Sequence, residues 1–350
     1  MNNYNFTKKD TNIVKGIAIL AMVLHHTYPS NPGLPFYMWN DRSLMLILSS
    51  CGKVCVTLLT ILSGYGLAES YRNKWKMVEY HRNIRFILSH CIQLISLYWV
   101  ILAWAYLLAF MQGHTIYDIY GKGFKGLQEL LLDILGLGGI GNGTIFIGSW
   151  YITAIIIYYI LFPGLKFLVK KCKYLVLILT YMPWIYYIIQ RNPNMHTDWW
   201  LFYIFPFVVG IYLSQNRILS KIYEALGNVK GIVISLLGFA CMLYLRLQVT
   251  LPMDTFLAFS VILLEMFIFT KVKVVADFLN RCGTQSANIW LLHGTIGGLI
   301  GNLNFTSNFM KFVLLMFLSM AVSIMIEEIK NYTQYNKNVN EIRKSLVKEK

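Results

Sequence analysis

Apolar runs recur along nearly the whole chain, and each is bounded by charged or turn-rich segments. A helix needs about 20 mainly apolar residues to cross a bilayer. The pattern therefore predicts an all-α integral membrane protein, a polytopic bundle of about ten transmembrane helices. The expected spans lie near residues 13–28, 43–70, 84–111, 150–168, 174–190, 199–214, 231–248, 255–271, 286–303 and 309–329.

Two segments depart from this simple pattern of long apolar runs separated by polar loops. The purely apolar part of the first span covers only residues 13–24, and the glycine-rich stretch 127–147 predicts a loop with a short interfacial helix. We expect residues 1–330 to form the membrane domain and residues 331–350 a polar cytoplasmic tail. Because no soluble domain is expected, any chemistry must use residues of the spans or of the loops between them.

Composition supports the membrane class and charge predicts its orientation. The chain is 57% hydrophobic and 13% charged, and its mean hydropathy is +0.53. The net charge of +15 invites a nucleic-acid interpretation, but alternating the loops places 24 Lys and Arg residues on the side of the N-terminus and 7 on the other. By the positive-inside rule both termini are cytoplasmic, which requires an even number of spans. The six cysteines have no metal-ligand spacing, so no metal site is expected.

The first span carries the candidate chemistry. Residues 15–26 read K-G-I-A-I-L-A-M-V-L-H-H, with a cation at one end and histidines at the other. Eleven residues make about three helical turns, so Lys15 and His26 share one stripe while His25 points to the side. Ionisable groups within a membrane are costly and usually functional. We therefore interpret this stripe as part of a site.

These residues resemble the opening signature of the acyltransferase 3 family, in which a basic residue and a histidine are separated by ten residues on the first span. Further segments resemble later family motifs in the same order, up to about Glu328: I-L-S-G-Y-G-L at Ser63, R-N-I-R at Arg82 and Arg85, S-W-Y-I-T-A at Trp150, F-P-F-V-V-G at residues 205–210, and S-A-N-I-W-L-L-H from Ser286 to His293. The chain departs from the family where Lys15 replaces the usual arginine, and where no proline follows Arg85.

The resemblance implies a membrane O-acyltransferase in a bacterial plasma membrane. Such an enzyme moves an acyl group, here expected to be acetyl, from cytoplasmic acyl-coenzyme A to a hydroxyl of a cell-surface carbohydrate or its lipid-linked precursor. Acyl-coenzyme A is then a co-substrate, no bound cofactor and no nucleic acid is expected, and the oligomeric state stays open.

Two histidines are the expected catalytic groups. Neutral imidazole can deprotonate an acceptor hydroxyl or carry the acyl group itself, which suits His26. His293 shares a helix face with Ser286 and could orient His26 or the acceptor, or only satisfy a polar contact. His26 itself could instead be a membrane histidine that hydrogen-bonds another helix. His25, Ser63, Trp150 and Ser286 are expected to support the site.

The donor is expected to bind at the cytoplasmic side. Arg82 and Arg85 are one turn apart at the start of a span, so with Lys15 they could hold the phosphates of coenzyme A. The alternative is an ordinary anchor to anionic headgroups. Glu265, within the eighth expected span, should face the bundle interior as a proton acceptor or as a structural partner of Lys53 or a histidine.

Three rival classes remain at the level of sequence. A transporter or flippase of glycans or lipid-linked substrates predicts internal duplication or paired broken helices, and neither is clear here. A glycan polymerase would more naturally carry arginines in a large external loop, and residues 111–149 contain none. A non-catalytic scaffold does not explain a buried histidine pair.

Overall fold

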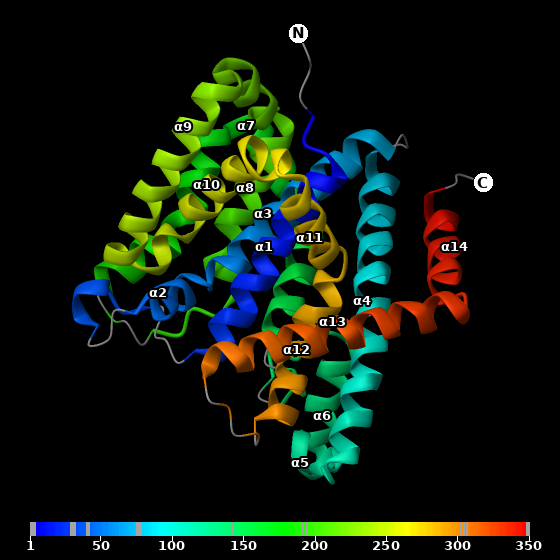
Figure 1. Cartoon of the computed structure of the whole chain (residues 1–350). Coiled ribbons are helices and arrows are strands. Elements are labelled where there is room, and N and C mark those ends of the chain that lie inside the picture. The colour runs from blue at the N-terminus through cyan, green and yellow to red at the C-terminus, as the bar shows by residue number, and fades with distance from the viewer. Residues whose placement is uncertain are drawn as a thin grey trace.

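A computed structural model describes residues 5–28, 33–39, 43–74, 79–141, 143–146, 148–190, 192, 195–301, 303, 305 and 307–347. The fold is all-helical, as predicted: helices make up 85% of it, and the described residues contain no strand. Figure 1 shows the helices gathered in one bundle. In chain order they are α1 (Lys8–Thr27), α2 (Leu44–Cys51), α3 (Val54–Lys74), α4 (Glu79–Met111), α5 (Ile116–Tyr120), α6 (Gly123–Ile134), α7 (Ser149–Gln190), α8 (Trp200–Gln215), α9 (Ile218–Val249), α10 (Asp254–Phe267), α11 (Lys273–Thr284), α12 (Ser286–Ile300), α13 (Asn308–Tyr332) and α14 (Tyr335–Val347).

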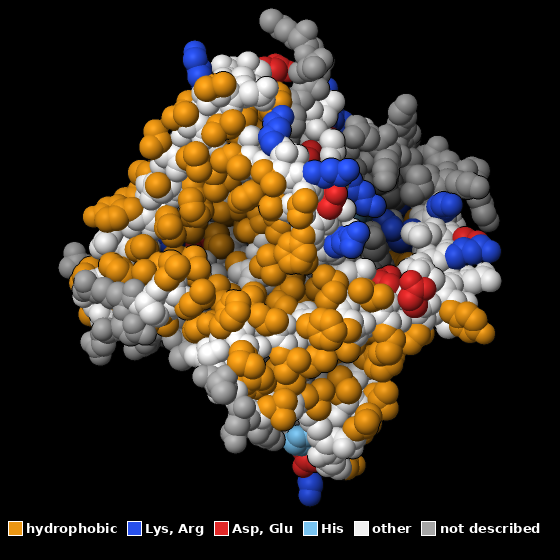
Figure 2. All heavy atoms as spheres, in the orientation of Figure 1, with side chains coloured by type: hydrophobic (Ala, Val, Ile, Leu, Met, Phe, Trp, Pro, Cys, Tyr) orange, Lys and Arg blue, Asp and Glu red, His pale blue; other side chains and the backbone are white. Residues whose placement is uncertain are grey.

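The outer surface fits a membrane protein. Figure 2 shows hydrophobic side chains covering the middle of one face, with most Lys and Arg side chains gathered toward the N-terminal end and around α14. Within the described residues, six helical stretches are long and apolar enough to cross a membrane. They are Leu44–Arg72, Arg82–Met111, Ser149–Gln190, Ile218–Val249, Leu251–Lys271 and Asn308–Tyr332.

All ten segments expected to span the membrane are helical, but a count of ten crossings stays a prediction. The helices α8 and α12 have only 16 and 15 residues. The first turns of α1 are too charged to read as a simple apolar span. The expected spans 150–168 and 174–190 fall within one continuous helical element, α7.

The long helix α7 reverses at Cys172, whose φ of −132° and ψ of 46° are not helical. Tyr158 precedes this residue and stacks on Phe207 of α8 with ring centroids 4.9 Å apart. Trp184 follows it and contacts Phe202 of the same helix at 4.9 Å. A straight 42-residue helix would be about 63 Å long and could not touch α8 with both parts. The two halves of α7 therefore run antiparallel to each other, and both pack against α8.

Glycines bring two pairs of helices into backbone contact. A methyl group on Gly64 of α3 would overlap the carbonyl oxygen of Phe207, and one on Gly210 of α8 would overlap that of Ile61. Helices within a membrane associate through such small residues because backbones can then approach closely. The glycines of two sequence motifs, at Ser63 and at residues 205–210, thus fix one helix pair.

Glycines also allow close backbone contact between α11 and the first half of α1. A methyl group on Gly16 would overlap the carbonyl oxygen of Leu279, and one on Gly283 would overlap that of Asn12. The Lys9 ammonium lies 3.0 Å from Asp277 at the exposed edge of this contact, and its hydrogen bond lowers the pKa of the Asp277 carboxyl. The short amphipathic helix α11 was not expected from the hydrophobic pattern, which placed residues 272–285 in a loop.

The segment 111–149, between α4 and α7, contains the expected short helix, α6. Asp133 at its end is fully buried and accepts hydrogen bonds from the hydroxyls of Tyr98 and Tyr120, from the Thr144 hydroxyl and from the Ile145 amide. Because Tyr98 belongs to α4, this carboxylate ties the segment to the bundle. The tail after residue 334 forms α14, which packs along α4 (Figure 1).

We expect Gly64→Ala to lower the free energy of unfolding by about 1–3 kcal/mol, because an added methyl group forces two backbones apart. Thermal unfolding in detergent measures the change. The matched control is Gly66→Ala on the same helix, where a methyl group meets nothing within 4 Å. Equal midpoints for the two variants would contradict the close contact between α3 and α8.

Candidate functional site

Three histidines meet where α1 ends beside α12. The ring centroids of His26 and His293 are 4.8 Å apart, and those of His25 and His26 are 5.1 Å apart. His26 is exposed, whereas His293 is only 4% exposed. The structure therefore brings the two expected catalytic residues together, with His26 open to a substrate and His293 behind it.

The hydrogen bonds of His293 define its free nitrogen. Its Nδ1 lies 2.7 Å from the carbonyl oxygen of Trp290, one turn earlier on α12. A carbonyl can only accept, so Nδ1 carries the proton and Nε2 is left with a lone pair in the neutral ring. This Nε2 is buried and has no hydrogen-bond partner among the described residues. The pair thus presents an unused acceptor beside His26.

His25 has a different partner, in keeping with its expected place off the stripe. Its Nδ1 lies 2.9 Å from the carbonyl oxygen of Ser49 in α2. The Ser49 hydroxyl in turn donates to the carbonyl oxygen of Tyr28 at 3.3 Å. A methyl group on Gly52 would overlap the carbonyl oxygen of Ala21. These contacts fix the C-terminal turn of α1, and with it His26, against α2.

A buried ion pair lies next to the contact between α1 and α2. Arg246 at the end of α9 pairs with Asp254 at the start of α10, and the two side chains are only 1% and 2% exposed. Arg246 also donates to the carbonyl oxygen of Ser50 at 3.0 Å. In the sequence, Arg246 is one of the seven Lys and Arg residues expected on the side opposite the N-terminus. The available signal was an arginine in an apolar run followed by an aspartate after the T-L-P-M turn.

A second ion pair stands near the exposed histidine. The Lys53 ammonium lies 2.6 Å from Asp198 and 3.4 Å from the Thr197 hydroxyl. Both charges act electrostatically on His26. Lys53 therefore has Asp198 as its partner and not Glu265, which was one of the expected options.

Glu265 lies at the opposite end of the bundle from the histidines. It belongs to the last turn of α10, is fully buried, and has the Asp10 carboxyl of α1 as its charged neighbour. Asp10 is in the first turn of α1, whereas His26 is in the last, so about 24 Å separate them along the helix. The structure does not bring Glu265 to the candidate catalytic pair.

A cavity of about 280 Å³ joins several of the other expected residues. Lys15, Ser63 and Ser286 line it together with Tyr151 and Trp290. The rings of Tyr151 and Trp290 are 4.8 Å apart, and Trp290 also accepts from His293 through its carbonyl oxygen. The cavity at Lys15 therefore ends one helical turn from His293. We call it the Lys15 cavity.

Trp150 lies next to the lining residue Tyr151 but does not itself line the Lys15 cavity. Its ring is 5.9 Å from that of Tyr151 and 5.3 Å from that of Tyr203, which packs it between α7 and α8. Ser63 donates to the carbonyl oxygen of Leu59 within its own helix at 2.9 Å. Both residues support the wall of the Lys15 cavity through packing.

A second hollow, of about 490 Å³, is strongly basic. The guanidinium of Arg82 and the ammonium of Lys166 each lie 3.8 Å from the centroid of the Tyr71 ring, at cation–π distance. Arg85 is not among the residues that line this hollow. We call it the basic pocket; its cations are Arg72, Arg82, Lys166, Lys170, Lys171 and Lys173.

The described residues contain no group of three or more His, Cys, Asp or Glu side chains placed to hold a metal ion. The site therefore offers imidazoles, buried hydroxyls and a set of cations for anionic ligands. Such an arrangement can move a proton near His26 and hold phosphates at the basic pocket.

Comparison with known proteins gives one match. The family model of the acyltransferase 3 family, described as an acyltransferase domain, matches residues 9–328. The searches of curated proteins and of solved structures gave no match.

We expect Asp254→Ala to destabilise the protein by about 3–5 kcal/mol, because it leaves the Arg246 guanidinium buried without its counter-charge. The double variant Arg246→Met, Asp254→Ala should recover much of this loss, since no buried charge remains. Thermal unfolding in detergent compares them, with Asp277→Asn at the exposed Lys9 pair as a control that should change little. Equal losses in the single and double variants would contradict this account.

Proposed function

The chain belongs to the acyltransferase 3 family and is a membrane acyltransferase, and from this membership we propose that it transfers an acetyl group from cytoplasmic acetyl-coenzyme A. The proposed acceptor is a hydroxyl of a cell-surface carbohydrate or of its lipid-linked precursor. Family membership favours this covalent chemistry over the transporter or flippase alternative.

We further propose ten spans with both termini in the cytoplasm of a bacterial cell and the protein in its plasma membrane. The distribution of Lys and Arg supports this orientation. The reversal of α7 at Cys172 supports two separate crossings in that helix, with Lys170, Lys171 and Lys173 at the cytoplasmic turn.

The observation that carries the proposal is the contact between exposed His26 and buried His293. In the proposed reaction His26 takes the proton of the acceptor hydroxyl as its oxygen attacks the thioester carbonyl. The new C–O bond forms, the C–S bond breaks, and the proton passes from His26 to the departing thiolate. His293 stabilises the protonated His26 through its free Nε2 after a small ring rotation.

Cations on the cytoplasmic side hold the donor in this proposal. The basic pocket supplies Arg82, and Arg85 and Lys15 extend the positive charge along α4 and into the bundle. Lys15 acts there as a point charge, since an ammonium cannot make the bidentate contact of the arginine that is usual in the family. No bound cofactor takes part.

We expect His26→Ala to lower acetyl transfer by about 100-fold or more, because the general base is lost. Membranes carrying the variant are incubated with labelled acetyl-coenzyme A, and label in the glycan fraction is counted. Size-exclusion chromatography in detergent checks that the variant is folded. His114→Ala, at an exposed histidine of the external segment, is the matched control. Transfer at the wild-type rate by folded His26→Ala protein would refute the assignment.

We expect Arg82→Ala to raise the KM for acetyl-coenzyme A about tenfold with little change in kcat, because a charge-assisted bond to phosphate is lost. Initial rates at varied donor concentration test this, with Lys230→Ala as an exposed-cation control outside the basic pocket. A change confined to the amount of protein in the membrane would favour a lipid anchor instead.

A further inference from the structure

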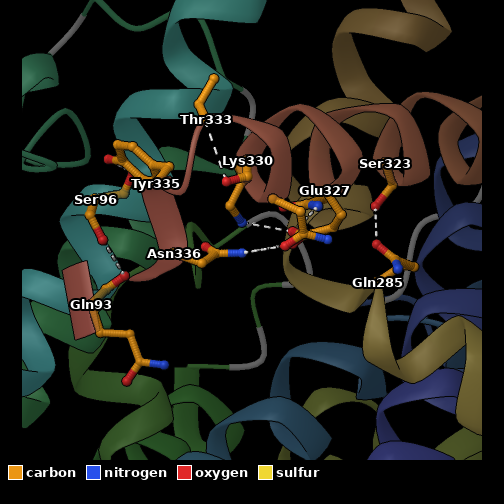
Figure 3. Close-up of polar contacts among 11 residues, drawn as sticks. Gln93, Ser96, Gln285, Ser323, Glu327, Lys330, Thr333, Tyr335 and Asn336 are labelled. Carbon is orange, nitrogen blue, oxygen red and sulfur yellow. Dashed lines mark hydrogen bonds and ion pairs between the residues drawn. The ribbon is translucent and has the colours of Figure 1, made fainter. Parts of the chain in front are cut away.

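A third cavity, of about 230 Å³, lies under the C-terminal helix α14. Figure 3 shows polar side chains around it, among them Gln93 and Ser96 of α4, Glu327 and Lys330 of α13, and Tyr335 and Asn336 of α14. The lining is rich in carboxamides and also contains Arg343 and the ion pair of Lys330 with Glu327. The residues that matter here are Gln93, Asn288, Lys330, Asn336, Asn340 and Arg343, and we call this cavity the amide pocket.

Specific hydrogen bonds hold α14 over the amide pocket. The Tyr335 hydroxyl donates to the carbonyl oxygen of Ser96 at 2.9 Å. Two turns along, Arg343 donates to the carbonyl oxygen of Ser89 at 3.1 Å and to its hydroxyl at 3.3 Å. The last part of the chain is therefore one wall of a defined cavity and not a loose tail.

Asn288 has an unused acceptor in this pocket. Its side chain is 3% exposed, and its Nδ2 donates to the Glu327 carboxylate at 2.9 Å. An ionised carboxylate only accepts, so this bond fixes which end of the amide is nitrogen. The Oδ1 atom is buried and lacks a hydrogen-bond partner among the described residues. A buried acceptor without a donor is unfavourable, so the pocket is complementary to a ligand that carries an N–H group.

The amide pocket borders the Lys15 cavity. Gln93, Leu97 and Ala287 line both. The basic pocket has no lining residue in common with the Lys15 cavity. Between those two lies a stack of rings: Tyr71 contacts Phe86 at 5.1 Å and Phe162 at 5.8 Å, and all three are at most 2% exposed. Of the two, the amide pocket under α14 is the one that borders the Lys15 cavity, so a path to that cavity starts there.

One face of α4 leads along this path. Arg85, Ser89, Gln93 and Ser96 are spaced by three or four residues, so they share a face. From Arg85 to Ser96 the helix rises about 16 Å. Arg343 contacts this face at Ser89, which places two guanidinium-bearing residues at its cytoplasmic end. The path thus offers cations first, carboxamides next and the Lys15 cavity last.

We infer that the amide pocket binds the pantetheine arm of the acyl-coenzyme A donor, an inference that rests on the proposed function. This arm is a flexible chain with two secondary amides between a pyrophosphate and the thioester. One amide N–H donates to Asn288 Oδ1, the pyrophosphate lies toward Arg85 and Arg343, and the thioester end passes through the Lys15 cavity along Trp290 toward His293 and His26. The 3′-phosphate stays the proposed ligand of Arg82, so Arg82 and Arg85 hold different phosphates of the donor.

Donors of decreasing length test the assignment. Acetyl-coenzyme A, acetyl-pantetheine and S-acetyl-2-mercaptoethanol are compared, the last having no amide. In Asn288→Ala the KM should rise about tenfold for the two amide donors and stay unchanged for the amide-free donor. Asn338→Ala on α14, outside the pocket lining, is the matched control. A rise that is equal for all three donors, or no rise, would overturn the inference.

A binding measurement keeps the test independent of turnover and of the Asn288 variant's folding. Maleimide labelling of Asn340→Cys is followed at that peptide by mass spectrometry. S-methyl-pantetheine keeps both amides and has no free thiol to consume the maleimide; at saturating concentration it should slow the labelling at least threefold, whereas adenosine 3′,5′-bisphosphate should not. Labelling unaffected by S-methyl-pantetheine, in protein that still uses acetyl-coenzyme A, refutes the pocket alone. Wild-type protein that neither binds nor uses acetyl-coenzyme A refutes the proposed function and this inference with it.

Discussion

The structure depends on how α1 is held at both ends. A helix that carries a lysine and two histidines through an apolar bundle must have its polar groups partnered or aimed at a cavity. At its N-terminal half, backbone contact with α11 through Gly16 and Gly283 leaves no room for lipid. At its C-terminal end, Ser49 of α2 and Gly52, the residue that follows α2, fix the turn that bears the histidines. Lys15 then lines a cavity and His26 meets His293 because the helix between them cannot shift.

Charged side chains lie in two separate regions of the bundle. The buried Arg246–Asp254 pair and the Lys53–Asp198 pair lie near the histidine end, and the basic pocket lies where α7 reverses. The interior between them is lined by aromatic rings and small polar groups. This arrangement suits the proposed reaction, in which a charged donor binds near the basic pocket and the acceptor approaches from the histidine end.

Much of this organisation could be predicted from the sequence. Each of the ten apolar runs proves to be helical, and the spacing of Lys15 and His26 selected one stripe of the first helix. His26 and His293, which come from the first and the last of the sequence motifs, lie in contact in the structure. The serine-glycine motif was expected to support the site, and its Gly64 proves to set the approach of α3 to α8.

Other features follow from tertiary contacts that no local pattern encodes. Nothing in the twelve residues of α11 indicates that they pack on α1, because the matching glycine lies about 270 residues earlier. The pair of Lys53 and Asp198 joins the turn between α2 and α3 to the segment before α8, and these are about 145 residues apart in the sequence. The pattern of spans alone therefore does not identify Asp198 as the partner of Lys53. The docking of α14 depends on backbone oxygens of α4, which the sequence does not display.

The turn of α7 at Cys172 has a consequence for how the protein is made. Lys170, Lys171 and Lys173 flank this turn, and the same side chains line the basic pocket. Lysines beside a span favour the cytoplasmic side of a membrane. In the proposed orientation and function, one set of charges therefore serves both membrane insertion and ligand recognition, so a substitution that neutralises these lysines would affect both.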